Sequence, residues 1–164
     1  MQLTDLDWVV CMFLINIPPA LYLSLVHQRG VVDASLWLGK SGIKSSMFLM
    51  PCHSTPLYSH VHSNTSLSFL SCEPNWSHTP GYRDEADLFY SSPLPWLEQK
   101  YPLAKPDTLP GSFLLFDRLE PQIQTFLTGR GFRLVKTFFH AHSAEGRVGY
   151  RVFVYCRGMG GVME

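Results

Sequence analysis

The sequence predicts an α/β fold, in which one N-terminal transmembrane helix is followed by a small α/β domain built on a mixed sheet. Three observations support this prediction. The segment from Trp8 to Val26 contains no charged residue. Further along the chain, short apolar runs of strand length alternate with helix-like segments. The last of these runs, from Tyr150 to Arg157, alternates between two sets of side chains, as a strand with one covered face does.

The composition agrees with a chain that is partly embedded in a membrane. Of the 164 residues, 46% are hydrophobic and only 16% are charged, whereas a soluble domain ordinarily has about 25% charged residues. The formal net charge is zero, and lysine and arginine form no block. A nucleic-acid partner is therefore disfavoured, because it would require a positively charged surface.

We assign residues 1–29 to the transmembrane helix and its flanks. At about 1.5 Å per residue, the segment Trp8–Val26 approaches the roughly 30 Å of a hydrocarbon core. The acidic N-terminus does not suit a cleaved signal peptide, although a buried helix or an uncleaved anchor is an alternative. The pair Pro18-Pro19 predicts a kink. By the positive-inside rule, Arg29 favours a cytosolic C-terminus.

The rest of the chain divides into a connector at 30–46, an α/β domain at 47–157 and a flexible tail at 158–164. Apolar runs predict five strands, at 47–51, 67–72, 111–117, 132–140 and 150–157. Between them we expect a helical turn at 55–62, a helix at 83–101 broken by Pro93 and Pro95, and a helix from Leu119 that ends at the glycines 129 and 131.

A loop rich in histidine and cysteine follows the first predicted strand, and it contains Cys52, His53, His60 and His62. Zinc requires three or four convergent ligands, and this spacing matches no standard site, so we predict no metal centre. Instead, the hydroxyl and imidazole groups are expected to cap a strand-to-helix turn. A disulfide among Cys52, Cys72 and Cys156 is compatible with an oxidising compartment, but the spacing does not assign the pair.

Two further groups of polar residues have a catalytic and a structural interpretation. Paired carboxylates such as Asp84, Glu85 and Asp87 can act in acid–base catalysis or hold a divalent ion, but their position favours a capped helix start. A hydrolase could combine Ser54, Asp117 and one of the histidines, and the candidates for this base are His140 and His142. The G-x-S-x-G turn typical of many hydrolases is absent from the sequence, which disfavours that reading.

Two N-glycosylation acceptors lie in predicted loops. They are Asn64, in Asn-Thr-Ser, and Asn75, in Asn-Trp-Ser, and neither triplet has a proline in its middle position. Together they favour a lumenal location for the α/β domain, in contrast to the indication from Arg29.

An ordered series of motifs resembles the C-terminal end of the GPI mannosyltransferase 3 family, a branch of glycosyltransferase family 22. The series begins at the membrane helix and extends to Tyr155. It consists of "PALYLSLVHQRGVVD", "FLMPCHSTPLYSHVH", "FLSCEPNW", "DEADLFYSSPLPWL" and "FFHAHSAEGRVGYRVFVY". Because the order and spacing of these blocks match together, the resemblance is more specific than any single motif.

The resemblance implies a membrane enzyme of the endoplasmic reticulum with the many transmembrane helices of the GT-C architecture. It implies dolichyl-phosphate-mannose as donor, a lipid-linked GPI precursor that receives its third mannose, and no cofactor or metal. In this family the catalytic acidic residues lie in an N-terminal lumenal loop that matches nothing here, so no catalytic residue is carried over. The expectation is a fragment that is inactive by itself.

Within such an enzyme, this chain would provide the last helix and a lumenal α/β cap, and its partners would be membrane lipid and the remaining helices of the full-length enzyme. His53, Tyr58 and His60 are the predicted substrate-binding residues, as contacts to sugar. The alternative function is a single-pass lumenal binding or regulatory protein that shares this domain.

Overall fold

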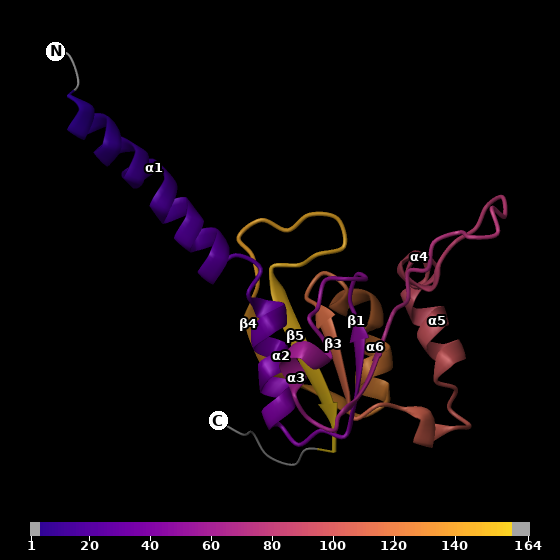
Figure 1. Ribbon diagram of the computed structural model, residues 1–164. Helices are drawn as coiled ribbons and strands as arrows, with labels where there is room; N and C mark the ends of the chain where they lie inside the picture. The colour runs from indigo at the N-terminus through magenta and orange to yellow at the C-terminus, as the bar shows by residue number, and fades with distance from the viewer. Residues whose placement is uncertain (1–3, 159–164) are drawn as a thin grey trace.

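A five-stranded sheet lies at the centre of the computed structural model, which describes residues 4–158 (Figure 1). The strand order is β2-β1-β3-β5-β4. β1 pairs in parallel with β2 and β3, whereas β5 pairs antiparallel with β3 and β4. The predicted mixed sheet is therefore confirmed. The strands are β1 (Ser45–Leu49), β2 (Ser66–Phe69), β3 (Ser112–Phe116), β4 (Phe132–Phe139) and β5 (Arg151–Arg157).

Helices cover both faces of this sheet, so that its central strands are buried on two sides. β1 and β3 are near-continuous apolar runs for this reason, and successive side chains enter opposite cores. Met47 lies in one core while Phe48 lies in the other. On the Phe48 side the covering helices are α2 (Gly30–Lys40) and α3 (Tyr58–Val61). On the Met47 side they are α4 (Glu85–Ser91), α5 (Pro93–Lys100) and α6 (Glu120–Gly129).

The helix predicted at 83–101 consists of two pieces that separate at Pro93, as expected, but Pro95 does not contribute to the break. α4 ends at Ser91, and Pro93 is the first residue of α5. Pro95 lies inside α5 and does not break it. A proline in the first helical turn is tolerated because its missing N–H would have no intrahelical acceptor there. A short 3-10 helix, η1 (Pro106–Thr108), precedes β3.

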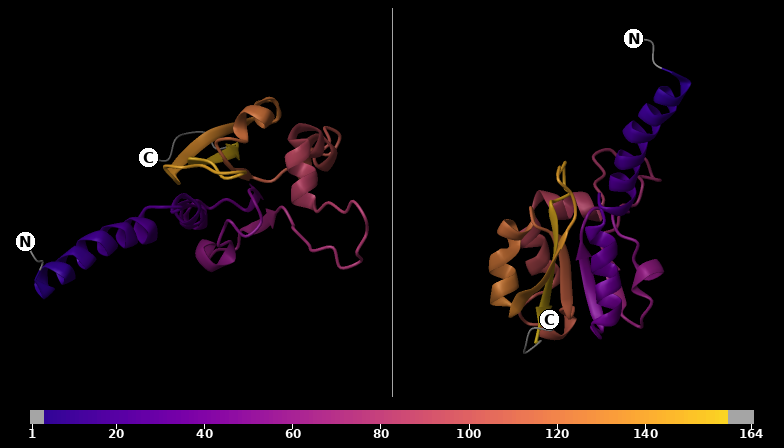
Figure 2. Two further views of the ribbon diagram at one scale, coloured as in Figure 1. Left: turned by 90° about the horizontal axis from the view of Figure 1, so that it is seen from above. Right: turned by 90° about the vertical axis from the view of Figure 1, so that its left-hand side faces the viewer.

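The N-terminal helix, α1 (Asp5–Leu25), projects from the α/β unit (Figures 1 and 2). It starts with a capping box between Thr4 and Asp7. The helix continues through Pro18 and Pro19, so neither proline ends it. Its apolar side chains are exposed all around the axis. Its 21 residues correspond to about 32 Å, so in length and composition α1 can cross a membrane.

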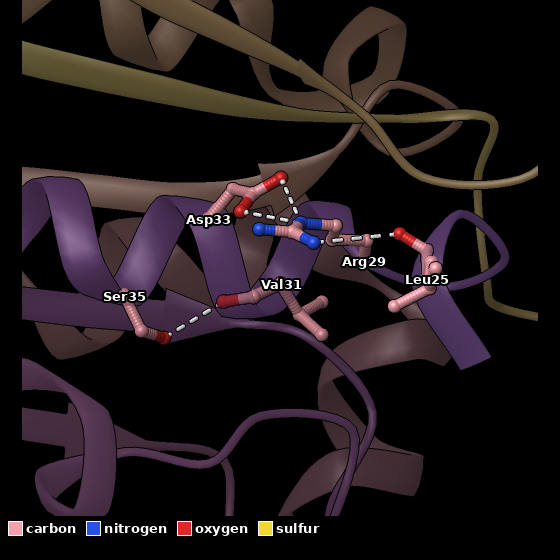
Figure 3. Close-up of polar contacts among 5 residues, drawn as sticks. All are labelled: Leu25, Arg29, Val31, Asp33 and Ser35. Atoms are coloured by element: carbon pink, nitrogen blue, oxygen red, sulfur yellow. Dashed lines mark hydrogen bonds and ion pairs between the residues drawn. The ribbon is translucent and has the colours of Figure 1, made fainter.

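The junction between α1 and α2 is held by Arg29. Its guanidinium group pairs with Asp33 at 3.0 Å and points back toward the carbonyl oxygen of Leu25 (Figure 3). From there α2 lies on the sheet with Leu38 fully buried. Most of the segment predicted as a connector, 30–46, is therefore a packed helix of the α/β unit. Of the predicted tail, residues 159–164 lie outside the part of the chain that the structure describes.

Candidate functional site

The histidine-rich loop is anchored at the carboxyl end of β1. Met50 is still buried, and Pro51 then turns the chain away from the sheet. A disulfide joins Cys52 to Cys72, with their Cα atoms 5.9 Å apart, and thereby connects the segment after β1 to the segment after β2. The sequence left this pairing open, and Cys156 is a buried free thiol. The disulfide therefore fixes the start of the histidine-rich loop against the segment that follows β2.

A mostly apolar cavity of about 200 Å³ lies beside this disulfide. His53 lines it together with Phe48, Leu57 and Phe69. His53 is exposed and has a positive backbone φ of 64°, a conformation that residues other than glycine seldom adopt. Such a cavity, with one imidazole at its rim, can accept a small amphipathic group.

The other two predicted sugar contacts lie on α3 and do not line this cavity. The hydroxyl oxygen of Tyr58 accepts a hydrogen bond from the backbone N–H of Leu67 at 3.1 Å, which ties α3 to β2. The Nδ1 atom of His60 lies 3.0 Å from the hydroxyl of Ser59. The structure thus brings only His53 of the three to the cavity. Substrate contact by His53, Tyr58 and His60 stays a prediction.

The two cysteines and the histidine nearest to them are the one group within residues 4–158 whose potential metal ligands lie close together. Potential ligand atoms of Cys52, His53 and Cys72 lie within 4.8 Å of one another. However, the two sulfur atoms are bonded to each other, and zinc binds thiolate sulfur. In the disulfide form this group therefore offers a single free ligand, the His53 imidazole, which is too few for a zinc site.

The residues considered for hydrolysis are engaged separately. The Ser54 hydroxyl donates to the carbonyl oxygen of Pro51 at 2.6 Å, and His142 Nδ1 lies 2.6 Å from the Tyr22 hydroxyl of α1. His140 is buried against the ring of Phe116. Among residues 4–158, no hydrogen bond joins Ser54 to either histidine. The serine and the two histidines therefore do not assemble into a nucleophile–base pair.

His140 lies in a largely apolar environment close to the end of α1. Burial, together with the nearby His27, lowers the pKa of His140, although the carboxylate of Asp117 opposes this shift. The backbone carbonyl oxygen of His140 accepts a hydrogen bond from the N–H of Gln28 at 2.7 Å. His140 therefore helps to attach the α/β unit to the segment that follows α1.

All three carboxylates of the acidic group have structural partners. Asp84 caps α4 by accepting from the N–H of Asp87 at 2.6 Å, as the sequence predicted. Glu85 accepts hydrogen bonds from Ser71 and from Lys100, the latter at 2.7 Å. Burial raises the pKa of Glu85, but the hydrogen bonds from Lys100 and Ser71 outweigh this and hold it below its ordinary value. Glu85 thus connects α4 to α5 and to the end of β2.

The structure also gathers three arginines that sequence analysis did not single out. Arg83 precedes α4, Arg118 follows β3, and Arg147 lies in the loop between β4 and β5. All three line a polar cavity of about 380 Å³, to which Asp87 and Tyr90 also contribute. These arginines are separated by tens of positions along the chain, so no local sequence motif indicates that they form a group.

The two glycosylation acceptors differ in their surroundings. Asn64 is exposed and lies two residues before the start of β2. The side-chain amide of Asn75 donates to the carbonyl oxygen of Thr79 at 2.8 Å, and its oxygen accepts from the N–H of the same residue at 3.0 Å. Asn64 is consequently the more available acceptor of the two.

Comparison with known proteins places the chain among glycosyltransferases. It is 44% identical over 153 residues to the GPI alpha-1,2-mannosyltransferase 3 of Danio rerio, which covers 89% of this chain and 28% of that protein. The Homo sapiens protein of the same name is 40% identical over 157 residues, 92% of this chain and 28% of its own length. The GPI mannosyltransferase 3 of Drosophila melanogaster is 40% identical over 135 residues, 77% of this chain and 24% of its own length.

These relatives are several times longer than the aligned region, and the chain spans little more than a quarter of the two vertebrate proteins. No family model and no solved structure matches the chain. The aligned region covers about nine tenths of the chain, so it includes most of the α/β unit and at least part of α1. The resemblance predicted from the ordered motifs is confirmed: the chain belongs to the GPI mannosyltransferase 3 family and corresponds to a C-terminal portion of its longer members.

Proposed function

We propose that this chain serves the transfer of mannose in GPI-anchor biosynthesis, as the C-terminal part of a mannosyltransferase. The observation that carries the proposal is the 44% identity to a GPI alpha-1,2-mannosyltransferase over 89% of the chain. The reaction that we infer uses dolichyl-phosphate-mannose as donor and adds the third mannose to a lipid-linked GPI precursor. Neither a metal nor another cofactor enters this proposal.

The exposed apolar surface of α1 supports a location in a membrane. A helix that is apolar on all sides requires either a protein core or a bilayer around it, and in residues 4–158 nothing buries α1. We propose that α1 crosses the membrane of the endoplasmic reticulum. There it would meet the remaining helices of the enzyme, which complete the groove for the two lipid-linked substrates.

The α/β unit is proposed to lie in the lumen. Its disulfide between Cys52 and Cys72 suits an oxidising compartment, and Asn64 offers an exposed glycosylation acceptor. Both features favour the lumen over the cytosolic side that Arg29 suggested. The sugar contacts predicted for His53, Tyr58 and His60 would then face the same compartment as the glycan.

In this proposal the α/β unit acts as a cap and does not carry the chemistry. In the family that the chain resembles, the catalytic acidic residues lie in an N-terminal lumenal loop that matches nothing here, and the carboxylates of Glu85 and Asp87 are engaged by Lys100 and Arg147. We therefore assign no catalytic residue within residues 4–158. The cap would close over the lumenal end of the helices and hold the acceptor glycan.

Complementation tests the proposal directly. The chain is expressed in cells that lack GPI mannosyltransferase 3, and a GPI-anchored surface protein is measured by flow cytometry. The full-length human relative is the positive control. We expect rescue by the control and none by this chain. Replacing the corresponding segment of the full-length enzyme with residues 4–158 should restore surface expression, whereas failure of this chimaera would argue for the alternative of a separate lumenal binding protein.

A further inference from the structure

The cavity lined by Arg83, Arg118 and Arg147 has the chemistry of an anion site. Three guanidinium groups surround it, and one carboxylate, that of Asp87, lies among them. The formal charge of these four groups is therefore positive. Guanidinium groups bind phosphate oxygens through paired, charge-assisted hydrogen bonds, and they retain their charge at any physiological pH.

Two of the arginines are held in place by neighbouring groups. Arg147 donates to Asp87 Oδ1 at 2.7 Å, and its guanidinium carbon lies 4.6 Å from the centre of the Tyr90 ring. Arg83 donates to the backbone carbonyl oxygen of Asp87 at 2.9 Å. Each of these contacts uses one terminal nitrogen and leaves other N–H donors of the same side chain free. The positions of the two groups are thus fixed without exhausting their hydrogen-bonding capacity.

Arg118 differs from these two arginines in that its guanidinium group makes no hydrogen bond or ion pair within residues 4–158, and its side chain is exposed. Arg118 comes directly after β3, at the carboxyl end of a strand that runs parallel to β1. Ligands of open α/β sheets commonly bind beyond this end of the strands.

The cavity also lies at the end of the sheet from which α1 emerges. Asp117, next to Arg118, accepts the N–H of Tyr150, so the β4–β5 loop sits beside the end of β3. The same loop contacts the end of α1 through the 2.6 Å interaction between His142 and Tyr22. The views in Figures 1 and 2 agree that this loop and the segment before α4 lie at the α1 end of the sheet. If α1 spans a bilayer, the cavity therefore lies at the end of the sheet that is nearer the membrane.

We propose that this cavity binds a phosphate group, with Arg83, Arg118 and Arg147 as its donors. The phosphate is supplied either by the phosphodiester of a membrane-lipid headgroup or by free phosphate. The lipid source rests on the proposed membrane location of α1, whereas the phosphate chemistry rests on the arginines alone. Such a site would hold the α/β unit against the lipid surface or against the phosphate of a lipid-linked substrate.

Isothermal titration of the full chain in neutral detergent micelles tests the site. The probes are short-chain phosphatidylinositol, short-chain phosphatidylcholine and inorganic phosphate. We expect phosphatidylinositol to bind, and Arg118→Ala or Arg147→Ala to weaken that binding about tenfold or more, since a hydrogen bond to a charged group is lost. Arg118→Lys keeps the charge but loses the planar fork, so its effect should be smaller than that of alanine.

Two further variants make the test specific. Arg133→Ala removes an exposed arginine at the start of β4, at the opposite end of the sheet, and should leave binding unchanged. Asp87→Asn removes the one carboxylate that competes with phosphate for Arg147 and should tighten binding. Thermal unfolding of each variant establishes that it is folded, and Arg118 is exposed enough for its replacement to be tolerated.

The probes distinguish the two sources of phosphate. Binding of phosphatidylinositol without competition by inorganic phosphate supports a lipid headgroup, while equal competition supports free phosphate. The arginines should repel the choline cation of phosphatidylcholine, so equal binding of phosphatidylcholine and phosphatidylinositol would overturn the proposal. It is also overturned if neither phosphatidylinositol nor inorganic phosphate binds, or if Arg133→Ala weakens binding as much as Arg118→Ala. Because no mannose transfer is measured, failure here leaves the proposed function standing, and failure of the complementation experiment leaves the phosphate site standing.

Discussion

Replacing Gly39 tests how the histidine-rich loop is positioned. Gly39 is the next-to-last residue of α2, and it lies where α2 passes the end of α3. A methyl group at this position would overlap the backbone carbonyl group of Val61, the last residue of α3. A backbone group cannot swing aside as a long side chain can, so Gly39→Ala must separate the two helices. Because α3 carries Tyr58, this separation would also displace the predicted sugar contacts.

The magnitude follows from two opposing effects. Alanine is about 1 kcal/mol more favourable than glycine inside a helix, whereas overpacking a well-packed position costs about 1 to 3 kcal/mol or more. For Gly39→Ala the overlap with backbone dominates, and we expect a net loss of about 1 to 2 kcal/mol. Gly129, the last residue of α6, is the matched control, because nothing lies within 4 Å of the methyl position there. Gly129→Ala should be neutral or stabilising by up to about 1 kcal/mol.

Thermal unfolding of the full chain in neutral detergent, followed by near-ultraviolet circular dichroism, measures both variants. At about 2 to 4 °C per kcal/mol for a chain of this size, Gly39→Ala should lower the midpoint by several degrees, while Gly129→Ala should not. If Gly39→Ala unfolds at the same temperature as the parent or higher, α2 and α3 do not meet as described, and the placement of Tyr58 by that contact is refuted.

Three further predictions concern the disulfide, a buried histidine and the glycosylation acceptors. Replacing Cys52 or Cys72 with serine should lower the free energy of unfolding by about 3 kcal/mol, as expected for a loop of this length; denaturant titration checks this. Because burial lowers the pKa of His140, the unfolded chain binds that proton first, so stability should decline as the pH falls below about 6.5, and His140→Phe should flatten this dependence in unfolding measured from pH 8 to 5. In mammalian cells, Asn64→Gln should remove an endoglycosidase-sensitive gel shift that Asn75→Gln largely preserves; unshifted parent protein would contradict the lumenal location.

The strands could be read from the sequence because burial on both faces leaves a direct signature. β3 is a run of five buried residues, Ser112–Phe116, and such a run is difficult to mistake for a surface segment. β5 was predicted to have one covered face, and this prediction was wrong. Val154 lies in one core and Tyr155 in the other, so both faces are covered and only the ends of the strand, at Arg151 and Arg157, are exposed. The positions of the strands were predicted where the chain crosses the core, and errors in position were confined to the ends.

α2 was missed as a core element because its apolar face is interrupted. Gly30 and Ser35 are both buried in it, and neither would be assigned to a core from its side chain alone. The backbone at Gly30 lies so close to the end of β4 that a methyl group there would crowd the carbonyl oxygen of Phe139 and the side chain of His140. Close backbone approach selects glycine in such a place, and this selection leaves no hydrophobic periodicity to detect.

The candidate sites were harder to predict than the fold, because they are built from turns that meet only after folding. β1 and β3 run in parallel, and both therefore deliver their following segments to the same end of the sheet. The connection after β1 carries His53, and the one after β3 carries Arg118. Antiparallel pairing of β5 with β3 brings the β4–β5 loop, with Arg147, to that end as well. The strand directions thus bring the segments that carry His53, Arg118 and Arg147 to the end of the sheet from which α1 leaves, and no local pattern in the sequence reports that meeting.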